Sequence, residues 1–234
     1  MTLNSLLDSL FPLGHQVAVI NKSLVGEART SLGTVSVMGT TDAALIDHEI
    51  CLRLSMAVLE VVEKYPQRPI VFLVDTSGQI LSRAAELLCL NKSFSHLAEC
   101  VDLARMQGHP TFSLVTANAV SGGFLAFGLM ADRIDALQNT EVRVMDLKAM
   151  ARVTKIDHQR LVLLAQSSAI FAPGAENYRR MGALEKIWDK PSEANLVEAL
   201  TEIRNRADSA DLRMKKGQTL GGRKFAEKIC HEVQ

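Results

Sequence analysis

Residues 69–79 read PIVFLVDTSGQ, an unbroken apolar run followed by a polar segment that contains a glycine. A second apolar run, residues 111–117 (TFSLVTA), precedes residues 119–124, which read AVSGGF. Apolar runs of this length, bounded by turn residues, are typical of strands buried on both faces of a parallel sheet. The two segments therefore predict two buried parallel strands, each followed by a turn that contains glycine.

Outward from these segments, strand-like and helix-like patterns alternate up to about residue 145, and the remainder is helical in pattern. The other expected strands are 17–20, 33–38, 132–137 and 142–145. The expected helices run from Thr41 or Asp42 to about Lys64, from 82 to about 107 with a break near 91–93, from 124 to about 131, and through most of 147–234. This order predicts an α/β fold with a mostly parallel sheet, crossover helices and helical C-terminal arms. No repeat or linker divides the sequence, so we expect one domain over residues 1–234.

The composition argues against several classes of function. Lys and Arg together number 26, Asp and Glu together number 26, and aromatic residues make up 5% of the chain. An extended nucleic-acid surface needs excess cations and stacking platforms, so it is not expected. The longest apolar run, Ala119–Ala131, is shorter than the about 20 residues of a membrane span. The N-terminus lacks a signal-peptide pattern and the cysteines form no C-x-x-C pair, so we expect a cytoplasmic protein with reduced thiols.

The two glycine segments share features that suit an anionic ligand. Each is expected to connect a buried strand to a helix. Glycine permits positive φ and close approach of the backbone, and a helix N-terminus has unpaired N–H groups with partial positive charge. These groups together make a site for an oxyanion or a carboxylate. The alternative is that the glycines serve only the packing of a tight connection between strand and helix.

The order and spacing of several short motifs resemble the carboxyltransferase branch of the crotonase/ClpP-like superfamily. The motifs are Val74-Asp75-Thr76-Ser77-Gly78, Ala85-Glu86, His109-Pro110, Ala119-Val120-Ser121-Gly122-Gly123-Phe124 and Val142-Arg143-Val144-Met145. Within that branch, the Ser-Gly-Gly turn and residues 171–178 (FAPGAENY) look most like the γ subunits of biotin-independent malonate decarboxylases. The resemblance implies a crotonase-like ββα superhelix.

The resemblance also implies a place in a multi-subunit carboxy-lyase. In this family a β subunit and a γ subunit share an active site, which decarboxylates a malonyl thioester to an acetyl thioester and CO2. The thioester is carried on an acyl carrier protein through a dephospho-CoA-derived prosthetic arm, and an acyl carrier protein transferase subunit belongs to the same complex. The γ subunit itself is expected to bind no cofactor and no biotin, and the chain contains no Ala-Met-Lys-Met attachment sequence.

Two sets of residues are implied to form the site on this chain. The catalytic set, whose backbone amides supply an oxyanion hole, is Ser121, Gly122 and Gly123. The substrate-binding set, in the neighbouring segment, is Asp75, Ser77, Gly78 and Gln79. In the family the thioester oxygen is held mainly by the β partner, so we expect this chain to bind the departing carboxylate. Stabilisation of charge by hydrogen bonds requires no nucleophilic side chain.

Two other functions stay open at this point. One is a carboxyltransferase half that acts on a biotinyl or acyl-CoA substrate, and the other is a non-catalytic scaffold for the β subunit. Ser121 occupies the nucleophile position of ClpP-like proteases, but the position that carries their histidine is Leu147 here. A serine nucleophile needs a base within reach, so hydrolysis is not expected.

The remaining polar residues are weighed against ordinary structural roles. No metal site is expected, because His48-Glu49 lacks the second histidine of a helical zinc site. His109 is expected in a turn, and Glu86 is either a cleft carboxylate or a helix-capping residue. Residues 161–164 (LVLL) are more apolar than one core face needs, which favours a subunit interface.

Two basic groups are candidates for attracting anionic partners. They are Arg152, Lys155 and His158 in one group, and Arg213, Lys215, Lys216, Arg223 and Lys224 in the other. The first group suits an anionic thioester arm and the second an acidic carrier protein. Both also fit a solvated, charged helix surface.

Overall fold

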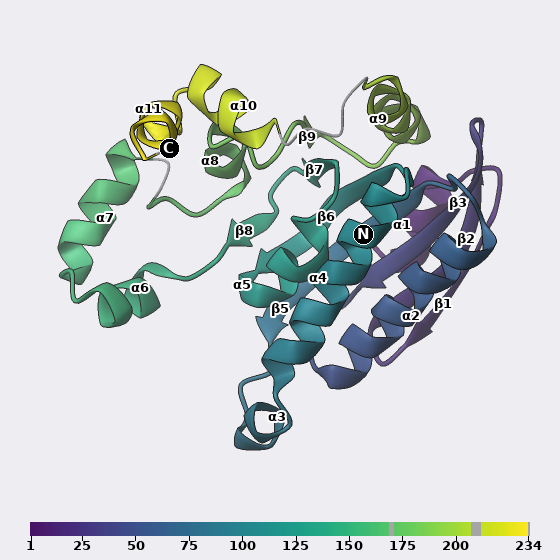
Figure 1. The fold of residues 1–234 in the computed structure, drawn as a ribbon, viewed down its shortest axis with the longest axis horizontal. Helices are drawn as coiled ribbons and strands as arrows, with labels where there is room; N and C mark the ends of the chain where they lie inside the picture. Colours follow the sequence, from purple (N-terminus) through teal and green to yellow (C-terminus); the bar gives the residue numbers. More distant parts are fainter. Residues whose placement is uncertain (169–170, 207–211, 234) are drawn as a thin grey trace.

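The computed structural model describes residues 1–168, 171–206 and 212–233, and one sheet runs through this part of the chain (Figure 1). The strand order is β1-β2-β3-β5-β6-β7-β9, with β4 beside β5 and β8 beside β6. The longer strands are β1 (His15–Ile20), β2 (Ser23–Thr30), β3 (Gly33–Thr40), β5 (Ile70–Gln79), β6 (Thr111–Val120) and β7 (Arg133–Leu137). The short strands are β4 (Ala44–Ile46), β8 (Glu141–Arg143) and β9 (Ile187–Trp188). Among the described residues β1, β2 and β3 pair antiparallel and the other pairings are parallel, which confirms the mostly parallel sheet.

Helices cover both faces of this sheet. One face packs against α2 (His48–Lys64), α4 (Leu90–Met106) and η1 (Phe124–Gly128). The other face packs against α1 (Leu3–Leu10) and α9 (Glu193–Asn205). Along β5, Phe72 and Val74 enter the first core and Val71 and Leu73 enter the second. Alternate residues of a strand point to opposite faces, so a strand between two helical layers must be apolar at every position.

Several helices project from the sheet as arms (Figure 1). They are α3 (Arg83–Leu87), α6 (Leu147–Thr154), α7 (His158–Ser167), α8 (Ala175–Arg180), α10 (Arg213–Thr219) and α11 (Ala226–Glu232). Within the described residues α6 buries no side chain and α7 buries only Leu161. The predicted helical C-terminal arms are confirmed, although β9 interrupts them.

The sequence did not predict β2, which lies between the two expected N-terminal strands. Its residues read SLVGEART and lack a clear apolar run. The turn before it, Asn21 and Lys22, has φ values of 48° and 64° at both positions, the conformation that joins two strands through a two-residue loop. Asparagine tolerates this conformation, but lysine gives no such signal, so the hairpin was not visible.

The expected start of the first long helix was wrong. Residues 44–46 form β4, and α2 begins at His48. Asp47 caps this helix, because its carboxylate accepts a hydrogen bond from the Ile50 backbone N–H. Asp42, one of the two expected caps, has φ of 54° and lies in a turn before β4.

The expected loop after the first buried strand was also wrong. Residues 75–79 continue β5, with a register shift against β6 between Val74 and Thr76. Ser82 caps α3, so the first glycine segment does not open directly into a helix. The helical stretch that follows breaks at Leu88 and Cys89 rather than near 91–93.

Candidate functional site

The two glycine segments meet at the carboxyl ends of β5 and β6. Thr76 pairs with Ala119 across the two strands. A Cβ atom added to Gly78 would lie 3.0 Å from Ser121 Cβ, and one added to Gly123 would lie 3.2 Å from Gly78 Cα. The two segments therefore touch each other and form one local structure, here named the glycine site (residues 75–79 and 118–123).

Glycine is required at two positions of this site for different reasons. Gly78 has φ of +100°, a conformation that L side chains rarely adopt. A Cβ atom at Gly123 would lie 2.8 Å from Thr76 Oγ1 and 2.9 Å from Ile46 Cδ1. Close packing therefore explains why residue 123 is a glycine. This packing does not involve the backbone amide of Gly123, which lies in the first turn of α5 (Ser121–Gly123).

The side chain of Gln79 lies against the second glycine segment. Its Oε1 atom accepts hydrogen bonds from Ser121 Oγ at 3.0 Å and from the Gly122 backbone N–H at 3.2 Å. One of the two amides expected to form an open oxyanion hole is thus already bonded to a carboxamide oxygen. Because Oε1 accepts both hydrogen bonds, the Nε2 group of Gln79 is left to donate to another partner.

The hydroxyl of Ser121 is bonded to an amide oxygen rather than to a base. The φ of Ser121 is 55°, and its hydroxyl donates to Gln79 Oε1, an amide oxygen that cannot accept a full proton near neutral pH. His48 is bonded instead to Ser93 Oγ and the Ala85 carbonyl oxygen, and His109 to the Arg68 carbonyl oxygen. The arrangement agrees with the expectation that Ser121 performs no hydrolysis.

The carboxylate of Asp75 connects three segments at the glycine site by hydrogen bonds. Its Oδ1 atom accepts hydrogen bonds from the backbone N–H of Asn118 at 3.1 Å and from Asn118 Nδ2 at 2.9 Å, and its Oδ2 atom accepts one from the Ala43 N–H at 3.0 Å. Both carboxylate oxygens are therefore used inside the chain. Asp75 holds β5, β6 and the turn before β4 together, whereas the family resemblance implied a role in substrate binding.

Two residues of the site were not singled out from the sequence. Thr76 Oγ1 donates to the Ala44 carbonyl oxygen at 2.8 Å and accepts from the Gly78 N–H at 3.0 Å, which fixes the conformation of Gly78. Asn118 is the partner of Asp75 described above. No spacing in the sequence signals these residues, because each acts on a neighbouring strand or on its own backbone.

The other residues predicted for the site lie at the glycine site or on the projecting arms. Ser77 is exposed beside Gly78, and Glu86 is exposed in the first turn of α3. The basic group Arg152, Lys155 and His158 is exposed on α6 and α7. The chain reaches α6 from β8, whose Arg143 pairs with Val120 next to the second glycine segment. The arms α3 and α6–α7 therefore both leave the sheet near the glycine site.

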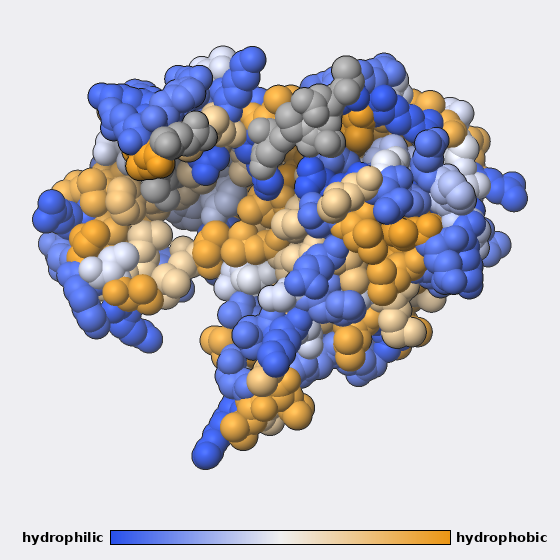
Figure 2. All heavy atoms as spheres, viewed as in Figure 1, coloured by the Kyte–Doolittle hydropathy of each residue, from blue (hydrophilic) through white to orange (hydrophobic). Residues whose placement is uncertain are grey.

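Large apolar side chains are exposed on these arms (Figure 2). Leu81 is 83% exposed, and Leu87 and Leu88 are each 72% exposed at the tip of α3. Val153 on α6 and Leu163 on α7 are 68% and 64% exposed. Large apolar side chains gathered on the tips of such arms are typical of contacts with another protein.

No group of three or more His, Cys, Asp and Glu side chains within residues 1–168, 171–206 and 212–233 is arranged to hold a metal ion. None of the helices in the same ranges combines the length and the apolar character that crossing a bilayer requires.

Comparison with known proteins gives the family context of this geometry. Residues 43–234 match the family model described as malonate decarboxylase gamma subunit. A curated relative, the malonyl-S-ACP:biotin-protein carboxyltransferase of Malonomonas rubra, is 29% identical over 188 residues, which is 74% of this chain. The chain spans 64% of the length of that relative.

Solved structures share the fold. A Pseudomonas malonate decarboxylase hetero-tetramer in complex with coenzyme A matches with a TM-score of 0.82 and 23% identity, over 97% of this chain and 96% of the matched chain. Transcarboxylase 12S matches with a TM-score of 0.74 and 15% identity, over 89% of this chain and 42% of that chain. These similarities confirm the crotonase-like carboxyltransferase fold.

Proposed function

The chain belongs to the malonate decarboxylase γ-subunit family, and from this premise we propose that it forms, with a β subunit, a site that decarboxylates a malonyl thioester carried on an acyl carrier protein. In this reaction the bond between the carboxylate carbon and the α-carbon breaks, and CO2 leaves. The electron pair moves into an enolate of the thioester, which takes up one proton to give the acetyl thioester. Hydrogen bonds directed at the developing charge lower the barrier, and one such donor typically contributes about 3–4 kcal/mol.

The observation that supports this proposal is the contact between the two glycine segments at the carboxyl ends of β5 and β6. The backbone amide of Gly123 lies in the first turn of a helix, where N–H groups have no partner four residues earlier. Gln79 adds a carboxamide whose oxygen is held by Ser121 and Gly122, which leaves Nε2 as a donor. We assign these two donors to the carboxylate that departs as CO2, which they bind and orient, and we assign the stabilisation of the enolate oxygen to donors of the β subunit.

The assignment revises the expected roles within the glycine site. Gly122 acts through Gln79, because its own amide is bonded to Oε1. Ser121 orients the same carboxamide, and Asp75 holds the strands that carry the two segments. Ser77 forms the exposed rim beside them, next to the buried Gly78.

A β subunit is the proposed occupant of the exposed arms. The arms α3 and α6–α7 leave the sheet near the glycine site and carry exposed apolar side chains, so a protein that covers them would also close the site. Closure removes water, which strengthens each hydrogen bond inside. The family to which the chain belongs is described as a subunit family, which supports a partner rather than a free-standing enzyme.

The carrier arm is the proposed source of the thioester. We assign the exposed cations Arg152, Lys155 and His158 to the approach of its phosphate groups, because they lie on an arm beside the site. The arm is of the dephospho-CoA type and belongs to the acyl carrier protein, which an acyl carrier protein transferase subunit would load. In this proposal the chain acts as one domain and carries no biotin and no cofactor of its own.

Release of CO2 from malonyl-carrier protein tests this function. The chain alone, a β subunit alone and their mixture are compared, with the Gln79→Met variant in a second mixture. Activity confined to the wild-type mixture is the expected result. Full activity of the β subunit alone would contradict the shared site and leave this chain a scaffold.

A second candidate function is a carboxyltransferase half. It is favoured by the name of the curated relative, which is a malonyl-S-ACP:biotin-protein carboxyltransferase. Such an enzyme passes the carboxyl group to biotin instead of releasing it. Addition of a biotinyl protein would then stimulate loss of the malonyl group, and avidin would abolish the stimulation, whereas a decarboxylase responds to neither.

A further inference from the structure

Helix α2 buries one side in the core and leaves the other side accessible over its whole length (Figure 1). The accessible side, here named the α2 face, consists of Glu49, Leu52, Arg53, Met56, Leu59, Glu60, Glu63 and Lys64. These positions recur at intervals of three or four residues, so they lie on one side of a helix that has 3.6 residues per turn. The α2 face is thus one continuous stripe of the molecular surface.

Large apolar side chains occupy the middle of the α2 face. Met56 is 70% exposed, Leu52 is 49% exposed and Leu59 is 36% exposed. Figure 2 shows hydrophobic surface over α2. The water-facing side of a helix is normally polar, so a row of exposed apolar residues along it is typical of a contact with another protein.

A groove of about 570 Å³ follows the α2 face on the side of β1 and β2. Ala18, Ile20 and Val25 supply apolar groups from the two strands, and Ile20 is itself 48% exposed. Strand β1 is at the edge of the described sheet, so it leaves this side of the groove open. The groove gives room for side chains of a protein that sits on the α2 face.

Charged side chains lie at both ends of the α2 face and pair within the helix. Arg53 Nη2 lies 2.6 Å from Glu49 Oε1, and Lys64 Nζ lies 2.9 Å from Glu60 Oε1. Among the described residues, Arg53 Nε is buried without a hydrogen-bond partner, and Nη2 is the guanidinium nitrogen for which a hydrogen bond is formed. The Arg53 guanidinium therefore retains donors for a carboxylate of another molecule.

We propose that the α2 face binds the same face of a second copy of this chain, with the two helices antiparallel about a two-fold axis. Leu52, Met56 and Leu59 of both copies then form the centre of the contact, where their apolar surface is removed from water. A two-fold contact uses one surface twice, so this surface must be complementary to itself.

The charges of the α2 face meet this requirement. When the axis passes through the middle of the helix, at 56–57, Arg53 of each copy faces Glu60 of the other. The same axis places Glu49 of each copy opposite Lys64 of the other. One arrangement thus sets two different pairs of opposite charges against each other, and each pair occurs twice.

Glu63 also finds a favourable position in this arrangement. It lies opposite the first turn of α2 in the second copy, where the positive end of the helix dipole favours a carboxylate. Every charged residue of the α2 face therefore meets an opposite charge or dipole on the same face of the other copy. This self-complementarity favours a second copy over an unrelated protein as the occupant. The inference does not depend on the proposed decarboxylation, and the β subunit is assigned to the arms α3 and α6–α7.

Sedimentation velocity of the purified full-length chain over a range of concentrations tests this contact. We expect a reversible equilibrium between monomer and dimer. Because a two-fold contact is closed, association should stop at the dimer. A monomer at every concentration, or assembly that continues beyond the dimer, would overturn the proposal.

Two variants that make the same kind of change locate the contact. Met56→Glu places a carboxylate at the apolar centre of the α2 face and is expected to abolish the dimer. Leu163→Glu makes a matched change on α7, where Leu163 is 64% exposed, and is expected to leave the dimer unchanged. Loss of the dimer in Leu163→Glu but not in Met56→Glu would show that the arms associate instead, and would overturn the proposal.

Reversal of charge tests the antiparallel arrangement itself. Arg53→Glu and Glu60→Arg each replace two attractive contacts by repulsive ones, so each is expected to raise the dissociation constant of the dimer about ten-fold. The double variant restores opposite charges across the axis and is expected to dimerise like the wild type. Positions 53 and 60 are about 10 Å apart along one helix, so an effect within a single chain would not be rescued. Each variant is first checked for an unchanged fold by circular dichroism. A double variant that dimerises no better than the two single variants would overturn the proposal.

Discussion

The carboxamide oxygen of Gln79 lies 3.2 Å from the backbone nitrogen of Gly122, so a side chain of β5 accepts a hydrogen bond from an amide in the first turn of the helix that follows β6. The same oxygen lies 3.0 Å from Ser121 Oγ. An anion at this site would therefore accept a hydrogen bond from the Nε2 group of Gln79 instead of from the Gly122 backbone N–H. We therefore expect the chemistry of the glycine site to depend on this one side chain more than on the two glycine amides.

Replacement of Gln79 tests that dependence. Gln79→Glu keeps the size of the side chain but brings a negative charge next to the substrate carboxylate and removes the Nε2 donor. We expect kcat/KM for the malonyl thioester to fall about 100-fold in the complex with a β subunit, because the substrate carboxylate loses a hydrogen-bond donor and meets a like charge. Gln107→Glu makes the same charge change at the exposed end of α4 and is expected to leave the rate unchanged.

The two adjacent glycines of the turn are expected to respond differently to alanine. In Gly123→Ala the new Cβ atom would meet Thr76 Oγ1 and Ile46 Cδ1, so we expect the free energy of unfolding to fall by about 1–3 kcal/mol and activity to fall with it. In Gly122→Ala the Cβ atom would meet Gln79 Oε1 at 2.8 Å, the end of a flexible side chain. We expect its stability to change little while activity falls. Urea unfolding and CO2 release are measured on both, and equal loss of stability in the two variants would contradict this account.

Asp75 is expected to contribute to stability rather than to chemistry. Asp75→Ala leaves the N–H groups of Ala43 and Asn118 without their acceptor. We expect a loss of about 2 kcal/mol in the free energy of unfolding. Asn118→Ala removes only one of the three hydrogen bonds and is expected to cost about 1 kcal/mol. A stable Asp75→Ala variant without activity would show instead that the carboxylate acts on the substrate.

Labelling of the cysteines is expected to show which surface the β subunit covers. Cys89 is exposed beside the apolar tip of α3, Cys230 is exposed on α11, and burial raises the pKa of the Cys51 thiol to about 12. Thiolate is the reactive form, so a thiol reagent at pH 8 is expected to label Cys89 and Cys230 but not Cys51. Addition of a β subunit is expected to slow labelling of Cys89. Labelling at an unchanged rate in a stable complex would place the partner elsewhere.

The pH dependence of stability is expected to contain a contribution from Glu185. Its pKa in the folded chain is held below the ordinary value, mainly by Lys216 against the opposing effect of burial. A group whose pKa is lowered by folding stabilises the fold above its unfolded pKa of about 4.3, and this contribution is lost as the pH falls. Between pH 5 and pH 3 the unfolding free energy of the wild type should therefore fall more steeply than that of Glu185→Gln. Equal slopes would show that the ion network does not form in solution.

The central fold was predictable because its signals are local. Each buried strand is an apolar run, and the Ser-Gly-Gly turn stands between such a run and a helix. β2 was missed because its pattern is mixed, and its hairpin turn uses Lys22 at positive φ. β4 was missed because a strand of three residues is too short to show a period.

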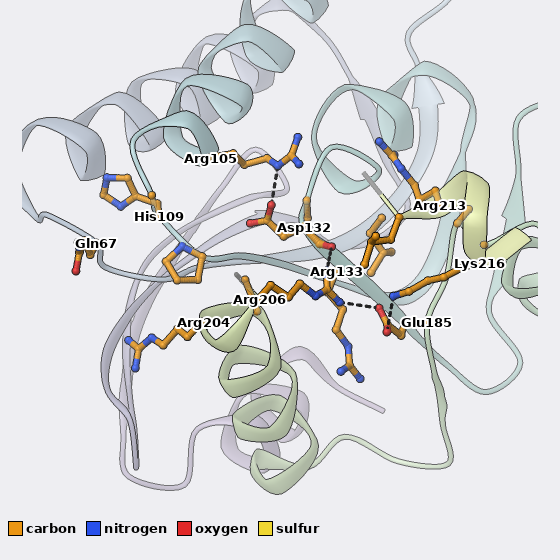
Figure 3. A pocket seen from close by; sticks show the side chains of 18 residues that line it. Gln67, Arg105, His109, Asp132, Arg133, Glu185, Arg204, Arg206, Arg213 and Lys216 are labelled. Atoms are coloured by element: carbon orange, nitrogen blue, oxygen red, sulfur yellow. Dashed lines mark hydrogen bonds and ion pairs between the residues drawn. The ribbon is translucent and has the colours of Figure 1, made fainter. Parts of the chain in front are cut away.

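The hydrogen bonds of the glycine site were not predictable, because they join residues that are far apart in the sequence. That Gln79 would bond Gly122, or that Asp75 would hold Ala43 and Asn118, follows only from the register of β4, β5 and β6. The cavity at the amino ends of β6 and β7 is a stronger case (Figure 3), since the described residues that line it come from six separate segments, at 67, 105–110, 131–134, 182–185, 203–206 and 212–216. Two of its residues, Arg213 and Lys216, had been assigned to a basic run from sequence adjacency alone.

The turn from Phe124 to Gly128 makes the site sensitive to the length of the chain as well as to its residue types. Leu129 N–H bonds to the Phe124 carbonyl oxygen, five residues back, so this turn contains one residue more than an α-helical turn. Deleting one residue here would tighten the turn and rotate every later position, including Arg133 at the start of β7. We therefore expect insertions and deletions in this short segment to be more disruptive than most substitutions, because they would change how β7 is placed relative to the glycine site.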